Sequence, residues 1–260
     1  MRRVKPSEAL PASDPLAPLL DLADVTEAVA AARQAVDEAL RHRALRRQGG
    51  QVAAEAALRA AQASAQLEGS DYSLEEIRSG TVTDPTVQGA LRIGEALVGL
   101  TESWGRAPLQ VLARLHVLAA RGLATEAELG RPSGSPLPPA EVSRRLAALA
   151  SLIAGGTSAP AIVVAAVVHA ELLALRPFAA GNGLVARGAA RLTLMQRGLD
   201  PRGLLVTEKG HAERIPEYVG AAGAYATGTR DGLRAWLRHY TTAVTLGAAE
   251  TTSIANQVMT

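Results

Sequence analysis

The stretch from residue 161 to residue 175 is apolar on every face of a helix except at His169 and Glu171. Its Ile-Val-Val run at 162–164 favours a β-strand by propensity. The stretch is long for a strand, however, and it follows a Ser-Ala-Pro sequence at 158–160 that is typical of a helix start. It is shorter than the about 20 residues that a helix needs to cross a bilayer. A helix that is apolar all round has to be covered by other elements, so we predict a buried central helix.

The residues available to cover that helix are mostly aliphatic. Of 260 residues, 48% are hydrophobic but only 3% are aromatic, so alanine, leucine and valine must supply the core. Alanine and leucine are among the best helix formers, and small side chains let helix axes approach closely. A chain of this length can bury a sizeable core as one domain. We therefore predict an all-α bundle.

Charge and cysteine content exclude several classes of function. The formal net charge is only +2, and the most basic run, at 41–47, precedes Gly49-Gly50 at a helix end, where cations suit the helix dipole. That run has no interleaved aromatics, so we predict no nucleic-acid partner. The absence of cysteine excludes disulfides, thiolate nucleophiles and Cys-ligated metals. Met1-Arg2-Arg3 is not followed by an apolar segment, so we expect a cytoplasmic protein that does not associate with membranes.

The N-terminal third is predicted to be a tail followed by a helical pair. Residues 1–20 contain repeated prolines and are expected to form a flexible tail. Asp24 and Glu27 have the spacing of a capping box that opens a helix. An alanine-rich stretch follows at 52–67, and the two helices together form a predicted segment over residues 21–80.

Further helix starts and stops divide residues 81–260, which we predict to form the main domain. Proline and glycine clusters make residues 130–139 the longest expected loop in it. Trp236 and Tyr240 are one helical turn apart and are predicted to face the core. Other helix signals are the cap at Ser73 with Glu76, starts at Asp84-Pro85, Pro108 and Pro139 (the last running to Ile153), a helix over 184–197 ended by Gly198, and helices over 219–226 and from Asp231.

A glycine-flanked turn follows the central apolar stretch, where residues 176–187 read Arg-Pro-Phe-Ala-Ala-Gly-Asn-Gly-Leu-Val-Ala-Arg. Gly181 and Gly183 permit positive φ and close backbone approach, and Asn182 tolerates the left-handed region. The helix that starts here would point free N–H groups and its positive dipole end at the turn, and Arg187 can add a bidentate contact. This pattern predicts an anion site, although turns without a ligand use the same residues.

The turn resembles throughout the signature loop of the Fic (Fido) family, His-Pro-Phe-x-(Asp/Glu)-Gly-Asn-Gly-Arg-x-x-Arg. The resemblance implies a Fic-like helical bundle that carries a small β-hairpin flap for the target chain. It also implies transfer of a nucleotide monophosphate, usually AMP from ATP, to a protein hydroxyl. In that family the loop histidine is the general base, the acid holds Mg²⁺, the glycine amides and the asparagine cradle phosphates, and both arginines bind phosphates.

Six positions of the loop match the family pattern and three do not. The matching positions are Pro177, Phe178, Gly181, Asn182, Gly183 and Arg187, so the resemblance assigns phosphate binding to Gly181, Asn182, Gly183 and Arg187. Arg176 replaces the base, Ala180 replaces the metal ligand and Leu184 replaces the first arginine. A guanidinium has no lone pair to accept a proton, and losing a general base costs about 10²–10⁴ in rate. We expect transfer to be nearly silenced, ATP or another nucleotide to remain a candidate ligand, and no Mg²⁺ ligand at Ala180.

A second motif agrees with the first. Residues 64–69 read Ser-Ala-Gln-Leu-Glu-Gly, and Glu68 lies at the helix end where the dipole disfavours an acid, so it would gain from a cationic partner. The segment resembles the Ser/Thr-x-x-x-Glu-Gly/Asn inhibitory helix of many Fic proteins, which implies a regulatory role for Ser64, Glu68 and Gly69. The resemblance further implies that Glu68 pairs with Arg187 and blocks productive ATP binding. A chance exposed glutamate is the alternative.

Several roles stay open on sequence alone. Arg176 is either a surface arginine at a helix end or a charge offered to an anion, and residues 130–139 are either the flap or a plain connection. His169 is two helical turns from Arg176, too far to replace the base, so we assign it a packing or hydrogen-bonding role. The chain is then a catalytically impaired Fic protein with a gated nucleotide site, an active transferase with non-standard residues on an unidentified target protein, or a helical interaction module without ligand. A homodimer is compatible with all three.

Overall fold

The computed structural model describes residues 14–259. Within this range every regular element is a helix, no strand is present, and one isolated β-bridge joins Arg121 and Ala124. The helices are α1 (Ala17–Leu20), α2 (Val25–Leu40), α3 (Ala44–Arg47), α4 (Gly49–Gln66), α5 (Leu74–Arg78), α6 (Pro85–Arg106), α7 (Pro108–Ala120), α8 (Pro139–Ile153), α9 (Ala161–Leu175), α10 (Asn182–Gln196), α11 (Thr207–Ala212), α12 (Ile215–Ala226) and α13 (Arg230–Met259). The predicted all-α bundle is confirmed.

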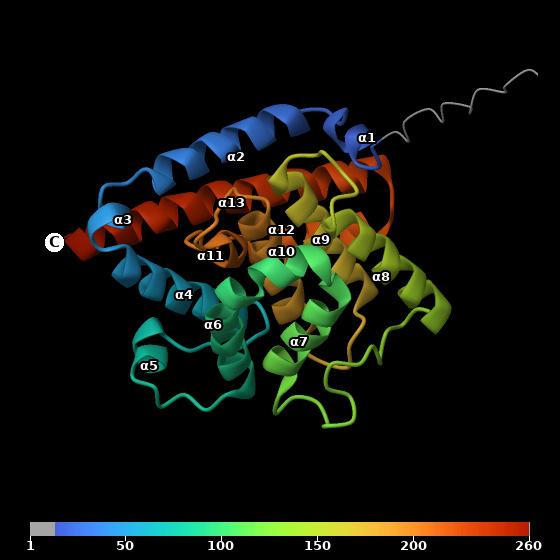
Figure 1. Ribbon diagram of the computed structural model, residues 1–260, viewed down its shortest axis with the longest axis horizontal. Coiled ribbons are helices and arrows are strands. Elements are labelled where there is room, and N and C mark those ends of the chain that lie inside the picture. Colours follow the sequence, from blue (N-terminus) through green and yellow to red (C-terminus); the bar gives the residue numbers. More distant parts are fainter. Residues whose placement is uncertain (1–13, 260) are drawn as a thin grey trace, which may run out of the picture.

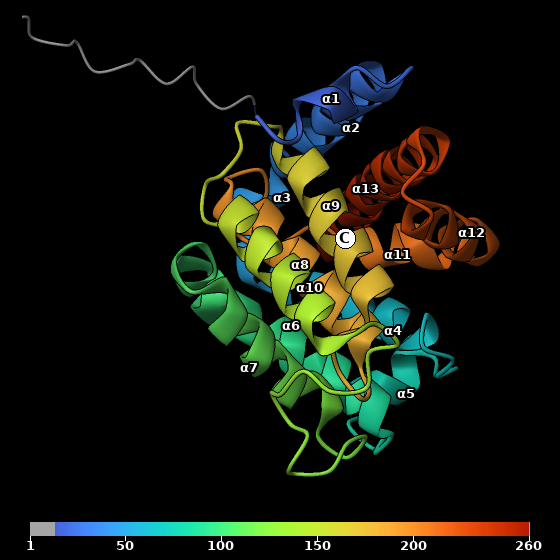
Figure 2. The same cartoon turned by 90° about the vertical axis from the view of Figure 1, so that its right-hand side faces the viewer.

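Helix α9 is the buried centre of the bundle, with the bounds that the apolar stretch predicts. It packs against α8, α10, α12 and α13, and Figures 1 and 2 show it among these helices. The Nε1 of Trp236 in α13 donates to the Ala166 carbonyl in α9 (2.8 Å), and both Trp236 and Tyr240 are buried, as predicted. The ring of this tryptophan therefore fixes α13 to the central helix.

The long helix α13 packs along α2, and the two lie side by side in Figure 1. The predicted capping box at Asp24 and Glu27 is wrong, because Asp24 has φ 62° and its side chain caps nothing. Its carboxylate instead pairs with Arg234 (2.7 Å) and Arg238 (2.9 Å) of α13. Gly49 and Gly50 also differ from expectation, since they form the first turn of α4 instead of preceding it.

The predicted tail includes a segment that is packed onto the bundle. Asp14 accepts hydrogen bonds from Thr157 Oγ1 (2.6 Å) and from the Ser158 amide (2.6 Å), and Leu16 is buried. The prediction of a flexible tail is therefore wrong for residues 14–20, whose partners lie far away in sequence. Residues 1–13 lie outside the described range.

Most local helix signals are confirmed. Ser73 and Glu76 form the predicted capping box of α5, and the Asp84 carboxylate caps the first turn of α6. Gly198 has φ 76° just past α10, as a C′ glycine should. No helix among residues 14–259 combines the length and apolarity that crossing a bilayer requires.

The loop over 130–139 contains no β-hairpin, so that part of the fold prediction is wrong. The loop nevertheless lies against the motif turn, because the Ser133 amide donates to the Pro177 carbonyl (2.8 Å) and Ser135 Oγ donates to the Leu175 carbonyl (2.6 Å). Its prolines, at 132, 136, 138 and 139, lack the N–H groups that a ladder needs. The two bonds fix the connection between α7 and α8 beside the end of α9.

Candidate functional site

The motif turn joins α9 to α10, two helices that pack directly against each other. Arg176 ends α9 in the left-handed region (φ 44°), and Gly181 precedes α10 with φ 67°. Positive φ at both ends reverses the chain within a few residues. The bond series of α10 starts at the Val185 amide, which donates to the Gly181 carbonyl (3.0 Å). The amides before it have no intrahelical acceptor.

Asn182 shapes this turn from within. Its Oδ1 accepts from the Phe178 amide (3.0 Å), and its Nδ2 donates to the Phe178 carbonyl (2.7 Å). The Phe178 ring stacks on His116 with centroids 4.0 Å apart, and His116 Nδ1 accepts from the Gly130 amide (2.9 Å). Nδ1 must be unprotonated to accept this bond, and burial lowers the pKa of His116 in agreement with that. Asn182 and His116 therefore hold the turn in shape, a role that no local sequence pattern indicates.

Arg187 projects from α10 and is almost fully buried, with 3% of its side chain exposed. Its Nε donates to Ser64 Oγ (2.8 Å), and its Nη2 donates both to the Ser64 carbonyl (3.0 Å) and to Glu68 Oε1 (2.7 Å). Its Nη1 donates to the Tyr218 hydroxyl (3.3 Å). The structure thus brings together the two motifs, which are separated by more than a hundred residues.

The carboxylate of Glu68 lies directly in front of the first turn of α10. A Cβ atom placed on Gly183 would overlap this carboxylate and would come within 3.0 Å of Arg187 Nη1. Gly183 is therefore a site of close approach, and only a residue without a side chain leaves room for Glu68 there. Gly69 follows with φ 94° and ends the α4 segment, as a C′ glycine does.

A pocket of about 360 Å³ opens at this turn. Among the described residues that line it, Glu68 is the single carboxylate, and it is paired with Arg187. Arg176 is exposed at the rim, and within the described residues its side chain makes no hydrogen bond or ion pair. The lining residues are Leu67, Glu68, Leu173, Arg176, Ala179, Ala180, Gly181, Asn182, Gly183, Arg187, Tyr218, Val219 and Ala222.

The positions that depart from the family pattern have unequal surroundings. Arg176 and Ala180 line the pocket, whereas Leu184 is 1% exposed and belongs to the core. Among residues 14–259, no cluster of three or more histidines and carboxylates is arranged to hold a metal ion. The pocket lining therefore does not fit Mg²⁺, since its one carboxylate is engaged by a guanidinium.

Two further residues, Tyr218 and His169, lie at this site, and the sequence analysis did not assign them to it. Tyr218 of α12 lines the pocket, and His169 Nε2 lies 3.0 Å from its hydroxyl. The hydrogen-bonding role predicted for His169 is confirmed, although its partner was not foreseen. The predicted α12 began at Val219, one residue after this tyrosine.

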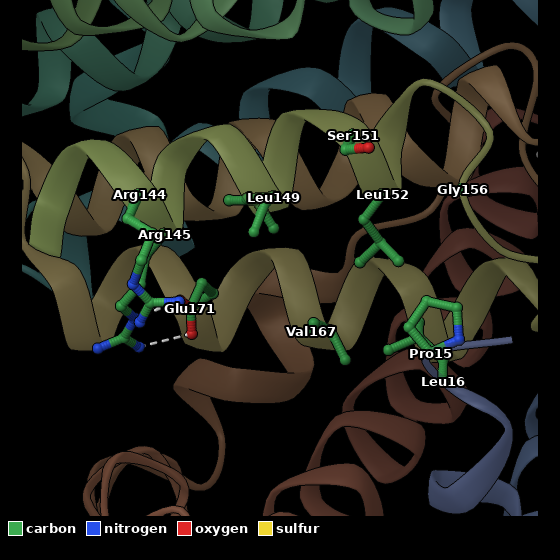
Figure 3. A pocket seen from close by; sticks show the side chains of 11 residues that line it. Pro15, Leu16, Arg144, Arg145, Leu149, Ser151, Leu152, Gly156, Val167 and Glu171 are labelled. Carbon is green, nitrogen blue, oxygen red and sulfur yellow. Dashed lines mark hydrogen bonds and ion pairs between the residues drawn. The ribbon is translucent and has the colours of Figure 1, made fainter. Parts of the chain in front are cut away.

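A second hollow of about 470 Å³ lies elsewhere, between the N-terminal segment and helices α8 and α9. Figure 3 shows Pro15 and Leu16 at one end and the Arg145–Glu171 ion pair at the other. The two bonds of that pair are 2.6 and 2.7 Å long, so its charges are already matched. No residue of either motif lines this hollow, and the predicted site is at the turn.

No protein-family model matches the sequence, and no curated protein matches it. Several solved structures do. A Fic family protein from Desulfovibrio desulfuricans G20 is 24% identical with a TM-score of 0.71, covering 87% of this chain and 74% of that one. Fic-1 from C. elegans is 21% identical with a TM-score of 0.71, covering 94% and 76%. A Fic domain containing signaling protein from Bacteroides thetaiotaomicron VPI-5482 is 14% identical with a TM-score of 0.62, covering 88% and 98%.

Proposed function

We propose that this chain, which has the fold of the Fic proteins, is impaired as a protein adenylyltransferase but keeps a pocket for a nucleotide or another phosphate-bearing ligand, gated by Glu68. The observation that supports this most is the ion pair of 2.7 Å between Glu68 and Arg187 at the start of α10. The carboxylate is itself an anion at the place where a phosphate would sit. An anionic ligand and Glu68 then compete for the same guanidinium.

The retained part of the site is the part that binds negative charge. The unbonded amides of the α10 first turn, the positive end of its dipole and Arg187 converge on one pocket. Arg176 adds a second guanidinium at the rim, which favours the interpretation of this residue as a charge offered to an anion. These groups neutralise a phosphate without a metal ion.

The two loop positions that differ in chemistry, Arg176 and Ala180, are those at which the Fic pattern has the general base and the metal ligand. A guanidinium at position 176 can donate hydrogen bonds but cannot take a proton from an attacking hydroxyl. Ala180 presents a methyl group to the pocket. We therefore derive no transfer step, and binding or regulation is the proposed output.

Calorimetry with ATP and ADP, each with and without Mg²⁺, tests this proposal on the wild type and on Glu68→Gly. We expect Glu68→Gly to bind at least about tenfold more tightly, because a competing carboxylate worth about 1.4 kcal/mol has been removed. We expect Mg²⁺ to leave the affinity of Glu68→Gly unchanged or to lower it, since no lining carboxylate is free to hold the ion.

The matched control is Asp71→Gly, which removes an exposed carboxylate three residues further along the same connection. Within residues 14–259 its side chain makes no hydrogen bond or ion pair. This variant should bind like the wild type. Absence of binding by both the wild type and Glu68→Gly would refute the nucleotide site and favour an interaction module.

A further inference from the structure

The hydroxyl of Tyr218 lies between two other buried groups, the guanidinium of Arg187 and the imidazole of His169. The distances are 3.3 Å to Arg187 Nη1 and 3.0 Å to His169 Nε2. All three side chains are buried, and they come from three different helices, α12, α10 and α9. A hydroxyl so placed fixes the relative positions of its two neighbours.

The direction of each hydrogen bond follows from which groups can accept. A guanidinium only donates, so Tyr218 Oη accepts from Arg187. The phenol proton is then free to be donated to His169 Nε2, provided that this nitrogen carries no proton. Burial raises the pKa of Tyr218 and lowers the pKa of His169 well below its usual value, so both groups are neutral. Of the two neutral tautomers of His169, only the one with its proton on Nδ1 gives the phenol proton an acceptor, and we assign that tautomer. Nδ1 has no hydrogen-bond partner within residues 14–259 in either tautomer.

The nitrogen that Tyr218 holds, Nη1, is the guanidinium nitrogen of Arg187 that lies nearest to Gly183. Nε and Nη2 of Arg187 are directed to Ser64 and Glu68, whereas Nη1 lies within 3.0 Å of where a Cβ on Gly183 would be. Nη1 is therefore the guanidinium nitrogen beside the free amides of α10. When Glu68 moves away, Nη2 keeps the Ser64 carbonyl and Nη1 keeps only Tyr218.

We infer that Tyr218, oriented by His169, is a positioning residue that holds Arg187 Nη1 toward the anion pocket when Glu68 is displaced. This inference rests on the proposed function, because it concerns the pocket in its open, ligand-binding form. Tyr218 acts through Arg187, and it is itself one of the residues that line the pocket. The open pocket is thereby prepared for an anion before the ligand arrives.

The first test measures ATP affinity in the Glu68→Gly protein, with and without Tyr218→Phe. The phenylalanine keeps the ring and removes only the hydroxyl, so we expect binding about 5–10-fold weaker, the size of one typical net hydrogen bond. The control is Tyr225→Phe on the same helix, whose hydroxyl lies 3.5 Å from Glu171 and outside the pocket. This control should leave the affinity unchanged. Equal affinity of Tyr218→Phe and its parent would overturn the inference.

The second test asks whether His169 acts as a hydrogen-bond acceptor or only as packing. In the Glu68→Gly protein, His169→Gln keeps an acceptor for the Tyr218 proton and His169→Leu does not. We expect the glutamine variant to bind ATP within about twofold of its parent and the leucine variant to lose as much as Tyr218→Phe. Adding Tyr218→Phe to His169→Leu should cost little more. Equal losses for glutamine and leucine would contradict the role of His169.

A third measurement needs no ligand and separates this inference from the proposed function. NMR of the ligand-free Glu68→Gly protein should resolve separate hydrogens on the two Nη atoms of Arg187, because Tyr218 and Ser64 restrict rotation of the guanidinium. Tyr218→Phe should merge these signals. If Glu68→Gly binds no ATP but the signals stay resolved, the nucleotide site is refuted and the positioning stands. If the signals are merged with Tyr218 present, the positioning is refuted whether or not ATP binds.

Discussion

Glu68 and Arg187 form an ion pair in which one partner is reachable from solvent and the other is not. The side chain of Glu68 is 28% exposed, that of Arg187 only 3%, and the bond between them measures 2.7 Å. Glu68 can therefore leave while the guanidinium stays in place, held by Ser64 and Tyr218. From this asymmetry we expect Glu68 to be the partner that moves and Arg187 the one that stays in place.

Removing Glu68 should lower the stability of the ligand-free protein. Glu68→Gly leaves the Arg187 charge buried without its counter-ion, and we expect a loss of about 1–2 kcal/mol in the free energy of unfolding. Glu68→Gln keeps a hydrogen-bond acceptor and should lose less. Urea denaturation measures both, and saturating ATP should restore the stability of Glu68→Gly. Equal stability of all three proteins would show that the pair contributes nothing.

A methyl group at Gly183 should displace the Glu68 carboxylate from the first turn of α10. Gly183→Ala places its Cβ where the Glu68 carboxylate lies, so we expect a loss of about 1–3 kcal/mol by overpacking. In the Glu68→Gly protein the same substitution should cost much less, which a double-mutant cycle of urea denaturation measures. Gly220→Ala is the control, since its Cβ meets nothing within 4 Å in α12 and should stabilise the helix by about 0.5–1 kcal/mol. Strictly additive losses would contradict the contact.

Asn182 should control the order of the turn. Asn182→Ala removes both bonds to the Phe178 backbone, and we expect a loss of about 1–3 kcal/mol together with loss of hydrogen-exchange protection at the Phe178 amide. Asn182→Asp keeps the acceptor and should retain protection of that amide, while its charge at the start of α10 competes with anions. The control is Asn256→Ala, whose side chain bonds His42 on the exposed surface. Unchanged protection at Phe178 in the alanine variant would refute the role.

The sequence predicted the elements that depend on local pattern. The bounds of α8 and α9 and the caps of α5 and α6 are confirmed, because apolar periodicity and capping residues act over a few positions. The Fic fold, predicted from the loop at 176–187, is confirmed by the structural comparisons. Short-range rules and one distinctive motif were therefore enough for the architecture.

The errors concern residues whose partners lie far away along the chain. Asp24 reads as a helix cap, yet its carboxylate finds Arg234 and Arg238 more than 200 residues later. Asp14 reads as part of a tail, yet it bonds Ser158. Tyr218 was missed for the same reason, since nothing near it in sequence indicates that its hydroxyl meets Arg187. Burial and long-range pairing decide these roles, and neither is visible in a local window.

Three positions differ from the Fic loop pattern, and we expect one of them, Leu184, not to tolerate the residue that the pattern has there. Leu184 is 1% exposed in the core, so Leu184→Arg buries an unpaired charge, and we expect a loss of about 3–5 kcal/mol. Ala180→Asp, at the pocket lining, should cost less than about 1 kcal/mol. Thermal or urea denaturation of the two single variants measures this difference. A stable Leu184→Arg protein would show that this helix face can turn toward the pocket.

Mild acid should destabilise the folded chain through its buried histidines. Burial lowers the pKa of His239 to about 4, and the pKa values of His169 and His211 also lie well below the usual value, for the same reason. Between about pH 6.5 and pH 4 the unfolded chain therefore binds protons that the folded chain does not, so stability rises with pH in this window. His239 alone contributes about 1–3 kcal/mol, which is fully present above pH 6.5 and is lost by about pH 4. Urea denaturation at intervals from pH 4.5 to 7.5 measures the slope. A flat profile would show that these rings are protonated inside the folded bundle.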